Sequence, residues 1–543
     1  MLNIAIGFST LSHMKEKILF FLFFLVTYFT GLYFSQDYGI SWDETIHQHW
    51  GVETYSIILD LINSSVINNF NHFDFLSQGP GVWFDLLTAF AADKMDLEST
   101  QEIYSMRHAF TFSIYFIGCI GFFLFSKIVF KDNTHAMIAT FFYLLHPRLL
   151  GNGFYNFKDS ILQAMIAISL FPIAKAFLTH HLKWICISAF LMGISIATRV
   201  IAIYIPVIFL MLFVIKIFIE KDFHRKWFLY FFFFIISVFA GIIIGWPTII
   251  EDPVYNIIRN FNIMKNAPWD GAVFFFGEYV QASKLAWYYI PVWFIITTPI
   301  IYLFLLFTGL IIFIRNSSCR KKYNIFIYLF MLCGLLVPFL SILYFSSTLY
   351  DGWRHMFFVY PFCAFFMYKG FIFAIVTLKK TLRLGGNTIM IIGLILVFSA
   401  PVISIINLHP HQQIYFNAFA GKDPMQKFEG DYWGTSYYQG LNWLCEHSKS
   451  SVAVWAPHSI AYNNTYLLDP ELNKKIKFIK IGSLQECIEE VEGMDVTCYY
   501  MTNFRYQQDF LYNKSDLNQY PFNNEVYTIS KGGMKILGIY KMN

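Results

Sequence analysis

Asp43 and Glu44 are adjacent carboxylates that follow the first strongly apolar stretch of the chain. A carboxylate just beyond the end of a membrane span is close enough to the lipid to reach a membrane-anchored substrate, yet wet enough to stay ionised. Such a group can act as a general base that takes a proton from a hydroxyl. The structural alternative is a solvated loop pair or a helix cap. These two residues are the first candidates for catalysis.

A second set of ionisable residues surrounds the connection between two further apolar stretches. His146-Pro147-Arg148 ends one stretch, and Lys158-Asp159 opens the next. Arg148 and Lys158 could contact a phosphate, while Asp159 could assist an acceptor group or a metal ion. The alternative is that the cations reach toward the membrane surface and that Asp159 caps a helix.

A third set lies in the segment 350–355, where Asp351, Arg354 and His355 stand between two apolar stretches. A planar guanidinium suits a bidentate grip on phosphate, and the imidazole of His355 could add a hydrogen bond. The alternative is an ion pair between Asp351 and Arg354 that fixes the loop. Because charges at the edge of a membrane are costly, we favour the functional interpretation.

Aromatic residues supply weaker candidates. Trp287 and Tyr288 precede an apolar stretch, a position typical of side chains at the level of the lipid headgroups. Their rings could also stack on a sugar and so bind substrate. The segments 409–417 and 428–434 follow the last apolar stretch, and we interpret them as a packed junction between domains.

The composition places most of the chain in a lipid bilayer. Of 543 residues, 57% are hydrophobic and 14% are charged, and Phe alone supplies 63. The mean hydropathy is +0.50, and soluble domains do not need so much apolar surface. The net charge of +4 is spread among loops, which gives no reason to expect nucleic acid as a partner. The eight cysteines show no metal-ligand spacing.

Apolar stretches long enough to cross a bilayer recur along the chain before residue 408. By the criterion of about 20 residues per span, we predict about 11 transmembrane helices. The region 184–215 is too long for a single span and is expected to turn near Thr198-Arg199. The predicted spans are 18–35, 107–126, 134–149, 160–178, 184–198, 201–216, 227–247, 290–314, 323–345, 356–377 and 387–407.

The short loops rich in Lys and Arg all fall on one side of this arrangement. The positive-inside rule makes that side the cytosol. We therefore expect an integral protein of the bacterial inner membrane, with a cytosolic N-terminus and a C-terminus on the periplasmic or extracellular side. The candidate residues then gather at the outer ends of the spans.

The chain is expected to divide into a transmembrane domain, residues 1–408, and an extracytoplasmic domain, residues 409–543. The first outer loop, about residues 35–106, has an apolar–polar pattern typical of helices that lie along the membrane surface. Strands and one helix are predicted in the tail at 452–455, 476–481, 496–500 and 534–540, and at 484–492. The expected fold class is an α-helical polytopic membrane protein with surface helices in the first outer loop and a small C-terminal α/β domain.

Taken in order along the chain, these motifs resemble the C-type integral-membrane glycosyltransferases, in the branch of the protein O-mannosyltransferases and the aminoarabinose lipid A transferases. The resemblance covers about residues 1–420. The residues that carry it are Asp43-Glu44, Arg107, His146-Pro147-Arg148, Lys158-Asp159, Trp287-Tyr288-Tyr289-x-Pro291 leading to Thr298-Pro299, and Asp351-Gly352-x-Arg354-His355.

The resemblance implies an enzyme that moves a hexose or pentose from a polyprenyl-phosphate donor to an extracytoplasmic acceptor, with inversion at the sugar. The acceptor class is a glycolipid, a polysaccharide or a protein. Asp43 matches the catalytic base, and Glu44 and Asp159 are further catalytic candidates. Donor-phosphate binding falls to Arg107, Arg148, Lys158, Arg354 and His355, and substrate binding to Trp287, Tyr288 and Asp351.

The same resemblance leaves the cofactor open. Members of this branch differ over divalent metals, and no ligand cluster stands out in the sequence, so no cofactor is assigned and a divalent cation stays an option. The tail departs from the mannosyltransferases because it lacks the pattern of their β-trefoil insert. The implied mechanism also requires the leading carboxylates to lie beside the guanidinium groups of Arg148 and Arg354.

Two other classes of function stay open. A transporter or flippase of a lipid-linked saccharide would also have many spans, but usually with paired halves and with charges near the bilayer midplane. The charges here are expected at the outer ends, and no internal repeat is visible. A ligase that joins a lipid-linked glycan to a surface acceptor would share the phosphate-binding cations without needing Asp43-Glu44.

Overall fold

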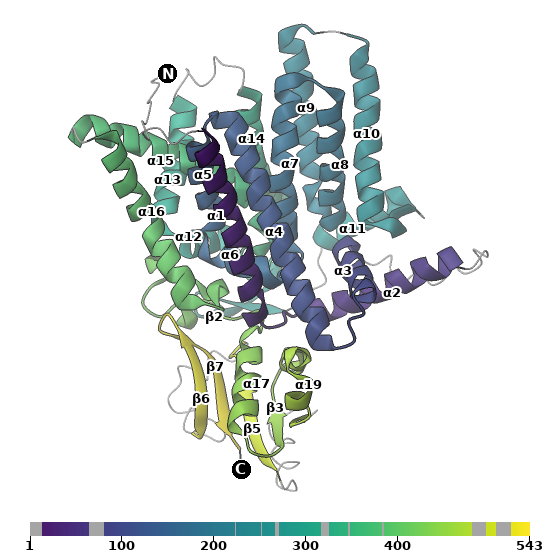
Figure 1. The fold of residues 1–543 in the computed structure, drawn as a ribbon, viewed down its shortest axis with the longest axis vertical. Helices are drawn as coiled ribbons and strands as arrows, with labels where there is room; N and C mark the ends of the chain where they lie inside the picture. Colours follow the sequence, from purple (N-terminus) through teal and green to yellow (C-terminus); the bar gives the residue numbers. More distant parts are fainter. Residues whose placement is uncertain are drawn as a thin grey trace.

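The computed structural model describes a bundle of helices with a small sheet packed at one end (Figure 1). The N-terminal helix begins at the far end of the bundle from the sheet, and the chain ends in the sheet. The described residues are 13–63, 81–222, 224–250, 252–265, 271–315, 325–345, 348–382, 385–479, 496–505 and 523–542.

Eight of the described helices, some counted with an adjoining short turn, are long and apolar enough to cross a membrane. Their composition makes the chain an integral membrane protein. The helices are α1 (His13–Phe34), α4 (Thr100–Phe130), α7 (Asp159–Thr179), α9 (Tyr204–Glu220), α10 (Lys226–Gly245), α14 (Ile325–Phe345), α15 (Tyr360–Leu382) and α16 (Gly386–Leu408).

Two of the 11 predicted spans are shorter helices. The predicted span 134–149 is α5 (Asn133–Leu144), which stops because His146 precedes a proline and adopts extended backbone angles before α6 (Pro147–Tyr155). The predicted span 184–198 is α8 (Leu182–Thr198), which has 17 residues and ends at the expected turn. The count of 11 spans therefore stays a prediction.

The predicted span 290–314 is broken in the middle. It consists of α12 (Tyr289–Thr297) and α13 (Ile300–Arg315), which are bent by 117° relative to each other. Thr298 is extended because Pro299 follows it, so the ladder of backbone hydrogen bonds is interrupted here. Asn417 replaces the missing bonds, since its side-chain amide donates to the carbonyls of Ile295 and Thr298, each at 2.6 Å.

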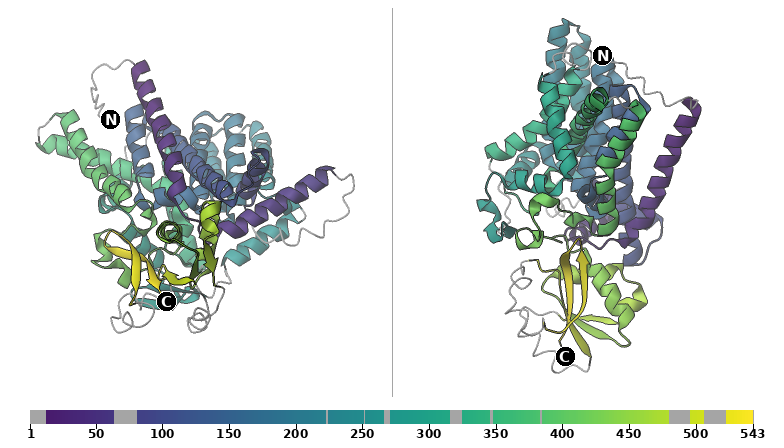
Figure 2. Two further views of the ribbon diagram at one scale, coloured as in Figure 1. Left: turned by 60° about the horizontal axis from the view of Figure 1, so that its bottom comes forward. Right: turned by 90° about the vertical axis from the view of Figure 1, so that its left-hand side faces the viewer.

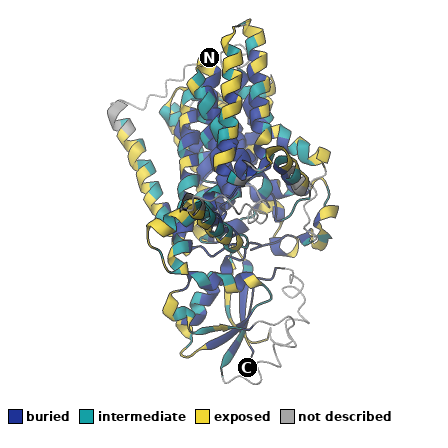
Figure 3. Cartoon of the chain, turned by 90° about the vertical axis from the view of Figure 1, so that its right-hand side faces the viewer, coloured by how far each residue is buried: buried dark blue, intermediate teal, exposed yellow. Residues whose placement is uncertain are grey.

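Close packing joins α13 to α15 at a pair of glycines. A Cβ atom on Gly309 would lie 2.0 Å from the carbonyl oxygen of Phe366, and one on Gly370 would lie 2.0 Å from that of Leu305. Only glycine permits so close an approach of two helix backbones. The packed centre of the bundle is dark in Figure 3, and exposed residues lie along the outer helices. Many of these exposed residues are large and apolar.

The segment predicted to be the first outer loop forms α2 (Glu44–Asn63) and α3 (Trp83–Lys94), so the helices predicted there are present. Helix α2 projects sideways from the bundle, as Figures 1 and 2 show. The segment between α10 and α12 forms α11 (Pro253–Lys265) and a hairpin of β1 (Ala272–Phe275) and β2 (Glu278–Gln281).

The tail forms a five-stranded sheet with the strand order β4-β3-β5-β7-β6. Strand β3 is parallel to β4 and β5, whereas β7 is antiparallel to β5 and β6. The strands are β3 (Val452–Trp455), β4 (Ile476–Phe478), β5 (Thr497–Thr502), β6 (Glu525–Lys531) and β7 (Met534–Lys541), and the helices are α17 (Ser436–His447), α18 (Ser459–Asn463) and α19 (Pro470–Asn473). Four strands match predicted ones, β6 was not predicted, and the predicted helix 484–492 lies outside the described residues.

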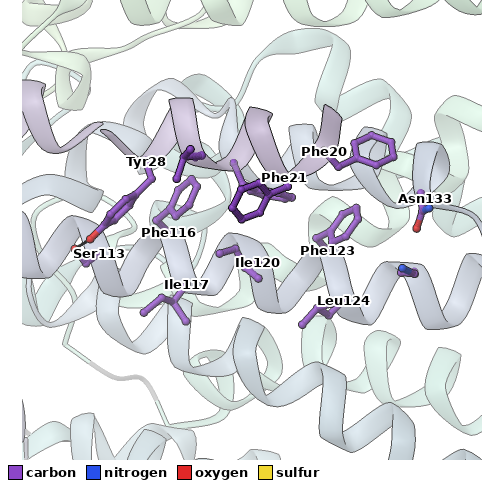
Figure 4. Close-up of a pocket in the computed structure, with 13 residues that line it drawn as sticks. Phe20, Phe21, Tyr28, Ser113, Phe116, Ile117, Ile120, Phe123, Leu124 and Asn133 are labelled. Carbon is purple, nitrogen blue, oxygen red and sulfur yellow. Dashed lines mark hydrogen bonds between the residues drawn. The ribbon is translucent and has the colours of Figure 1, made fainter. Parts of the chain in front are cut away.

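Helix α1 packs loosely and leaves an apolar groove against α4 (Figure 4). Only 11% of the most apolar 18-residue stretch of this helix is buried within the protein. The groove has a volume of about 500 Å³, and phenylalanines of both helices line it. The Tyr28 and Ser113 hydroxyls hydrogen-bond each other at 3.0 Å, which leaves its walls almost entirely apolar.

Candidate active site

Asp43 lies in the turn directly before α2. Its side chain is 39% exposed, and its Oδ2 lies 3.6 Å from Nη1 of Arg354. Burial would raise the pKa of this carboxyl, but the charges of Arg354 and Lys158 hold the pKa below its ordinary value. Asp43 is therefore an ionised carboxylate that is still open to solvent.

Asp159 opens α7 and faces the same guanidinium. Its Oδ2 lies 3.5 Å from Nη1 of Arg354, and its Oδ1 lies 2.6 Å from Nη2 of Arg199. Asn156 holds the carboxylate from the other side, because its side-chain amide donates to Oδ2 at 3.1 Å. The two carboxylates predicted from separate motifs, Asp43 and Asp159, thus meet at Arg354.

Arg354 is buried at the centre of this cluster, between the rings of Tyr350 and Trp433 at 4.9 and 4.6 Å from its guanidinium carbon. Its Nη2 forms an ion pair with Asp351 at 3.1 Å. Asp351 and Gly352 have φ values of +54° and +71°, a left-handed turn that is strained at a non-glycine residue. This strained turn places the carboxylate of Asp351 against Arg354, and such strain is common at functional sites.

Lys158 is a further cation in the electrostatic surroundings of Asp43 and Asp159. Within the described chain its ammonium makes neither a hydrogen bond nor an ion pair, although Asp43 and Asp159 are among its electrostatic neighbours. Burial lowers the pKa of Lys158 to about 8, against the opposing effect of Asp43. Because its charge is not committed elsewhere, this ammonium is available to an anionic ligand.

Glu44 points away from the cluster. Its Oε1 lies 3.0 Å from Nε2 of His108, and its Oε2 accepts hydrogen bonds from the backbone and the hydroxyl of Ser41 at 2.6 and 3.0 Å. The side chain is buried and both oxygens are occupied. Glu44 therefore fixes the loop that carries Asp43, and its catalytic role stays a prediction.

Arg107 also lies in a buried pair of its own. Its guanidinium contacts Asp85 at 2.7 Å and the hydroxyl of Thr88 at 2.6 Å, and its carbon lies 5.3 Å from the ring centre of Phe84. These contacts join α4 to α3. These contacts give Arg107 a structural role, and its binding of the donor phosphate stays a prediction.

Arg148 occupies a separate pocket at the junction with the tail. It is fully buried between the rings of Trp293 and Phe416, and Nη2 donates to the carbonyl of Tyr415 at 3.2 Å. Its Nε and Nη1 have no hydrogen-bond partner in the described chain. Of the expected contacts between the leading carboxylates and the two guanidinium groups, that of Asp43 with Arg354 is present. Glu44 is held by His108 instead, and Arg148 makes no ion pair with any described carboxylate.

The other predicted site residues lie at the margins. His355 packs against Tyr350, with 4.8 Å between ring centres. Trp287 and Tyr288 are 71% and 41% exposed at the start of α12, and their predicted contact with substrate stays a prediction. Among the described residues, no group of His, Cys, Asp or Glu is suited to hold a metal ion.

Two residues of the site came from segments that the motifs did not single out as catalytic. Trp433 covers Arg354 from the junction 428–434, and Arg505 reaches Asp351 from the tail sheet at 2.7 Å. The sequence holds no signal for Arg505, because it stands at the end of a short strand, far along the chain from every other site residue.

Comparison with known proteins places the fold. No protein-family model and no curated protein matches the chain. Among solved structures, ArnT from Cupriavidus metallidurans bound to undecaprenyl phosphate is similar over 97% of this chain and 98% of that one, with a TM-score of 0.50 and 10% identity. An oligosaccharyltransferase, AglB from Archaeoglobus fulgidus in complex with an inhibitory peptide and a dolichol-phosphate, covers 96% of this chain and 74% of its own, with a TM-score of 0.47 and 11% identity. This chain has the fold of the C-type integral-membrane glycosyltransferases, as the resemblance of its motifs predicted.

Proposed function

We propose that the protein is a membrane glycosyltransferase that moves a sugar from a polyprenyl-phosphate donor to an extracytoplasmic acceptor, with inversion at the sugar. The observation that carries this proposal is the setting of Asp43, an ionised and solvent-open carboxylate that lies 3.6 Å from Arg354 and has among its electrostatic neighbours Lys158, an ammonium that makes no ion pair within the described chain. A base with cations in its neighbourhood suits a reaction that removes a proton and releases an anion. The fold, shared with ArnT, agrees with that chemistry.

The reaction needs one base and one stabilised leaving group. Asp43 takes the proton of an acceptor hydroxyl, and the acceptor oxygen forms a bond to the anomeric carbon of the sugar. The bond between that carbon and the phosphate oxygen breaks, and its electron pair leaves with the lipid phosphate. Attack opposite the leaving group inverts the anomeric centre. The exposed side of Asp43 then returns the proton to solvent.

The cations divide the electrostatic task. Arg354 is shared by Asp43, Asp159 and Asp351, so its charge is largely neutralised before any ligand arrives. Lys158 makes no ion pair in the part of the chain that the structure describes, and we assign to it the first contact with the donor phosphate. Arg354 keeps Asp43 ionised and adds to the positive potential at the leaving group.

No step is assigned to a metal ion. Asp43 and Asp159 are the carboxylates that would be available to a divalent cation, but the guanidinium of Arg354 lies between them at 3.6 and 3.5 Å. Oxygen-rich ligand sets are what Mg²⁺ and Ca²⁺ require. The arrangement around Arg354 therefore does not fit such an ion.

The sidedness follows from charge. The Lys- and Arg-rich turn between α9 and α10 lies at the end of the bundle away from the sheet, and the tail lies at the other end (Figure 1). The positive-inside rule then puts the site and the tail outside the cytosol. We propose a bacterial inner-membrane protein whose acceptor, a glycolipid, polysaccharide or protein, is reached from the periplasmic side.

Replacing the base tests the mechanism. In Asp43→Asn the carboxylate is lost with little change of shape, and we expect transfer to fall by roughly 10²–10⁴-fold, the usual contribution of a general base. Binding of undecaprenyl phosphate, used as a probe and followed by Trp fluorescence in nanodiscs, should persist. Asp93→Asn, at an exposed residue of α3, is the control and should transfer normally.

Each alternative function predicts a different result. A flippase would move a fluorescent lipid-linked sugar across vesicles whether or not Asp43 is intact, and a ligase would release a polyprenyl carrier without needing this base. If Asp43→Asn transfers sugar near the wild-type rate, the proposed mechanism is wrong. Mass spectrometry of lipid-linked sugars and surface glycans, with and without the gene, would identify donor and acceptor together.

A further inference from the structure

The tail sheet sends one cation into the candidate site. Arg505 follows β5, the central strand of the sheet, and is 7% exposed. Its Nη2 donates to Oδ1 of Asp351 at 2.7 Å, and its Nη1 donates to the carbonyl of Tyr432 at 2.5 Å. The other oxygen of Asp351 holds Arg354. A chain of ion pairs thus runs from the tail through Asp351 to the guanidinium that faces Asp43.

We propose that Arg505 is a positioning residue for transfer, which acts through Asp351 to set how Arg354 divides its charge among the surrounding carboxylates. This inference rests on the proposed function. Arg505 neutralises one oxygen of Asp351, so Asp351 competes less strongly for Arg354. Arg354 then stays close to the carboxylates of Asp43 and Asp159.

Backbone strain at both ends supports a functional contact. Asp351 has a φ of +54°, and Phe504, the residue before Arg505, has a φ of +61°. Phe504 is fully buried, so the strain is not at a loose loop. Non-glycine residues adopt this region at a cost, and such residues cluster at functional sites. Two strained turns therefore meet where Arg505 contacts Asp351.

Contacts other than those of Arg505 also hold the tail against the helical bundle. The backbone of Ile40 pairs with the side-chain amide of Asn464 in both directions, at 2.9 and 3.1 Å. Lys531 donates to the carbonyl of His409 at 2.8 Å, and Tyr104 stacks on Tyr466. Loss of Arg505 should therefore leave the tail attached and change the site.

The experiment follows release of polyprenyl phosphate by the full-length enzyme in nanodiscs, supplied with a membrane lipid extract of the source organism. For Arg505→Gln we expect kcat to fall by roughly 10–100-fold, as for a displaced reacting group. The apparent KM for the extract should stay within about threefold, because ground-state binding is retained. Arg505→Lys, which keeps a charge for Asp351, should recover much of the rate.

A double mutant separates positioning from a general loss of structure. Because Arg505 acts through Asp351, Arg505→Gln should cost little further activity in an Asp351→Asn background. Lys531→Met removes a tail contact outside the site and should behave as wild type. A normal kcat in Arg505→Gln, no recovery with Lys, or effects that add in the double mutant would overturn the inference. Absence of turnover in the wild type would instead count against the proposed function.

Discussion

Lys158 lies where its protonation should govern donor binding. Its pKa is lowered to about 8 by burial, and only the ammonium form attracts a phosphate. Above that pH, each further pH unit lowers the fraction of Lys158 in the ammonium form about tenfold. We therefore expect the Kd of undecaprenyl phosphate to rise by about tenfold per pH unit. The measurement is the Kd of undecaprenyl phosphate in nanodiscs at a series of pH values from below to above the pKa of Lys158. Lys158→Arg keeps its charge at every pH, so its Kd should not change with pH. If the Kd of the wild type and of this variant changed with pH in the same way, the assignment of phosphate binding to Lys158 would be wrong.

Arg107 allows a test that separates structure from donor binding. Arg107→Met leaves Asp85 fully buried without its main cation, and breaking such a pair costs about 3–5 kcal/mol. We expect a clear fall in the thermal unfolding temperature in detergent, with normal probe binding by the molecules that stay folded. Lys94→Met removes an exposed pair and should not change the unfolding temperature. Lost probe binding at unchanged stability would support the predicted phosphate role instead.

Sequence reasoning found the residue types of the site but not the division of labour among them. Asp43 and Glu44 are neighbours, and only the three-dimensional loop decides that one faces Arg354 and the other His108. Arg148 carries the right charge, but its aromatic pocket is assembled from segments far apart in the chain. Arg505 could not be found at all, because its contact with Asp351 depends on how the tail docks.

Among the elements, the contact of α13 with α15 is sensitive to added volume, because backbone carbonyls lie directly against its two glycines. In Gly370→Ala a methyl group would meet the carbonyl of Leu305 at 2.0 Å, and overpacking of this kind costs about 1–3 kcal/mol. We expect a lower unfolding temperature and lower yield of folded protein in detergent. Gly385→Ala, where the nearest atom would be 3.6 Å away, is the control. Equal stability of the two variants would show that the helices can separate freely.

The helices themselves were largely predictable, since apolar length determines a membrane span. The differences occur at two prolines. Pro147 divides a predicted span into α5 and α6, and Pro299 breaks another into α12 and α13. Both prolines were visible in the sequence. A proline within a span can either kink the helix or end it, and the outcome depends on which neighbouring groups bind the freed backbone carbonyls. Here Asn417 accepts that role for Pro299 by binding the freed carbonyls.

At the scale of the whole molecule, the arrangement of charge predicts the orientation. A reporter fused after residue 543 should lie outside the cytosol, so alkaline phosphatase should be active there and green fluorescent protein should be dark. A reporter inserted at the turn between α9 and α10 should give the opposite pair of results. The same outcome at both positions would show that the proposed sidedness is wrong.

The bond from Asn417 to the break between α12 and α13 has a consequence for biogenesis. Thr298 and Asn417 are 119 residues apart, so at 5–20 residues per second the ribosome needs on the order of ten seconds to supply the amide after the break has been made. During that interval two carbonyls of a nascent hydrophobic segment lack their final partner. The insertion machinery must therefore hold this segment until the junction with the tail emerges, and truncation before Asn417 should leave a chain that quality-control proteases recognise.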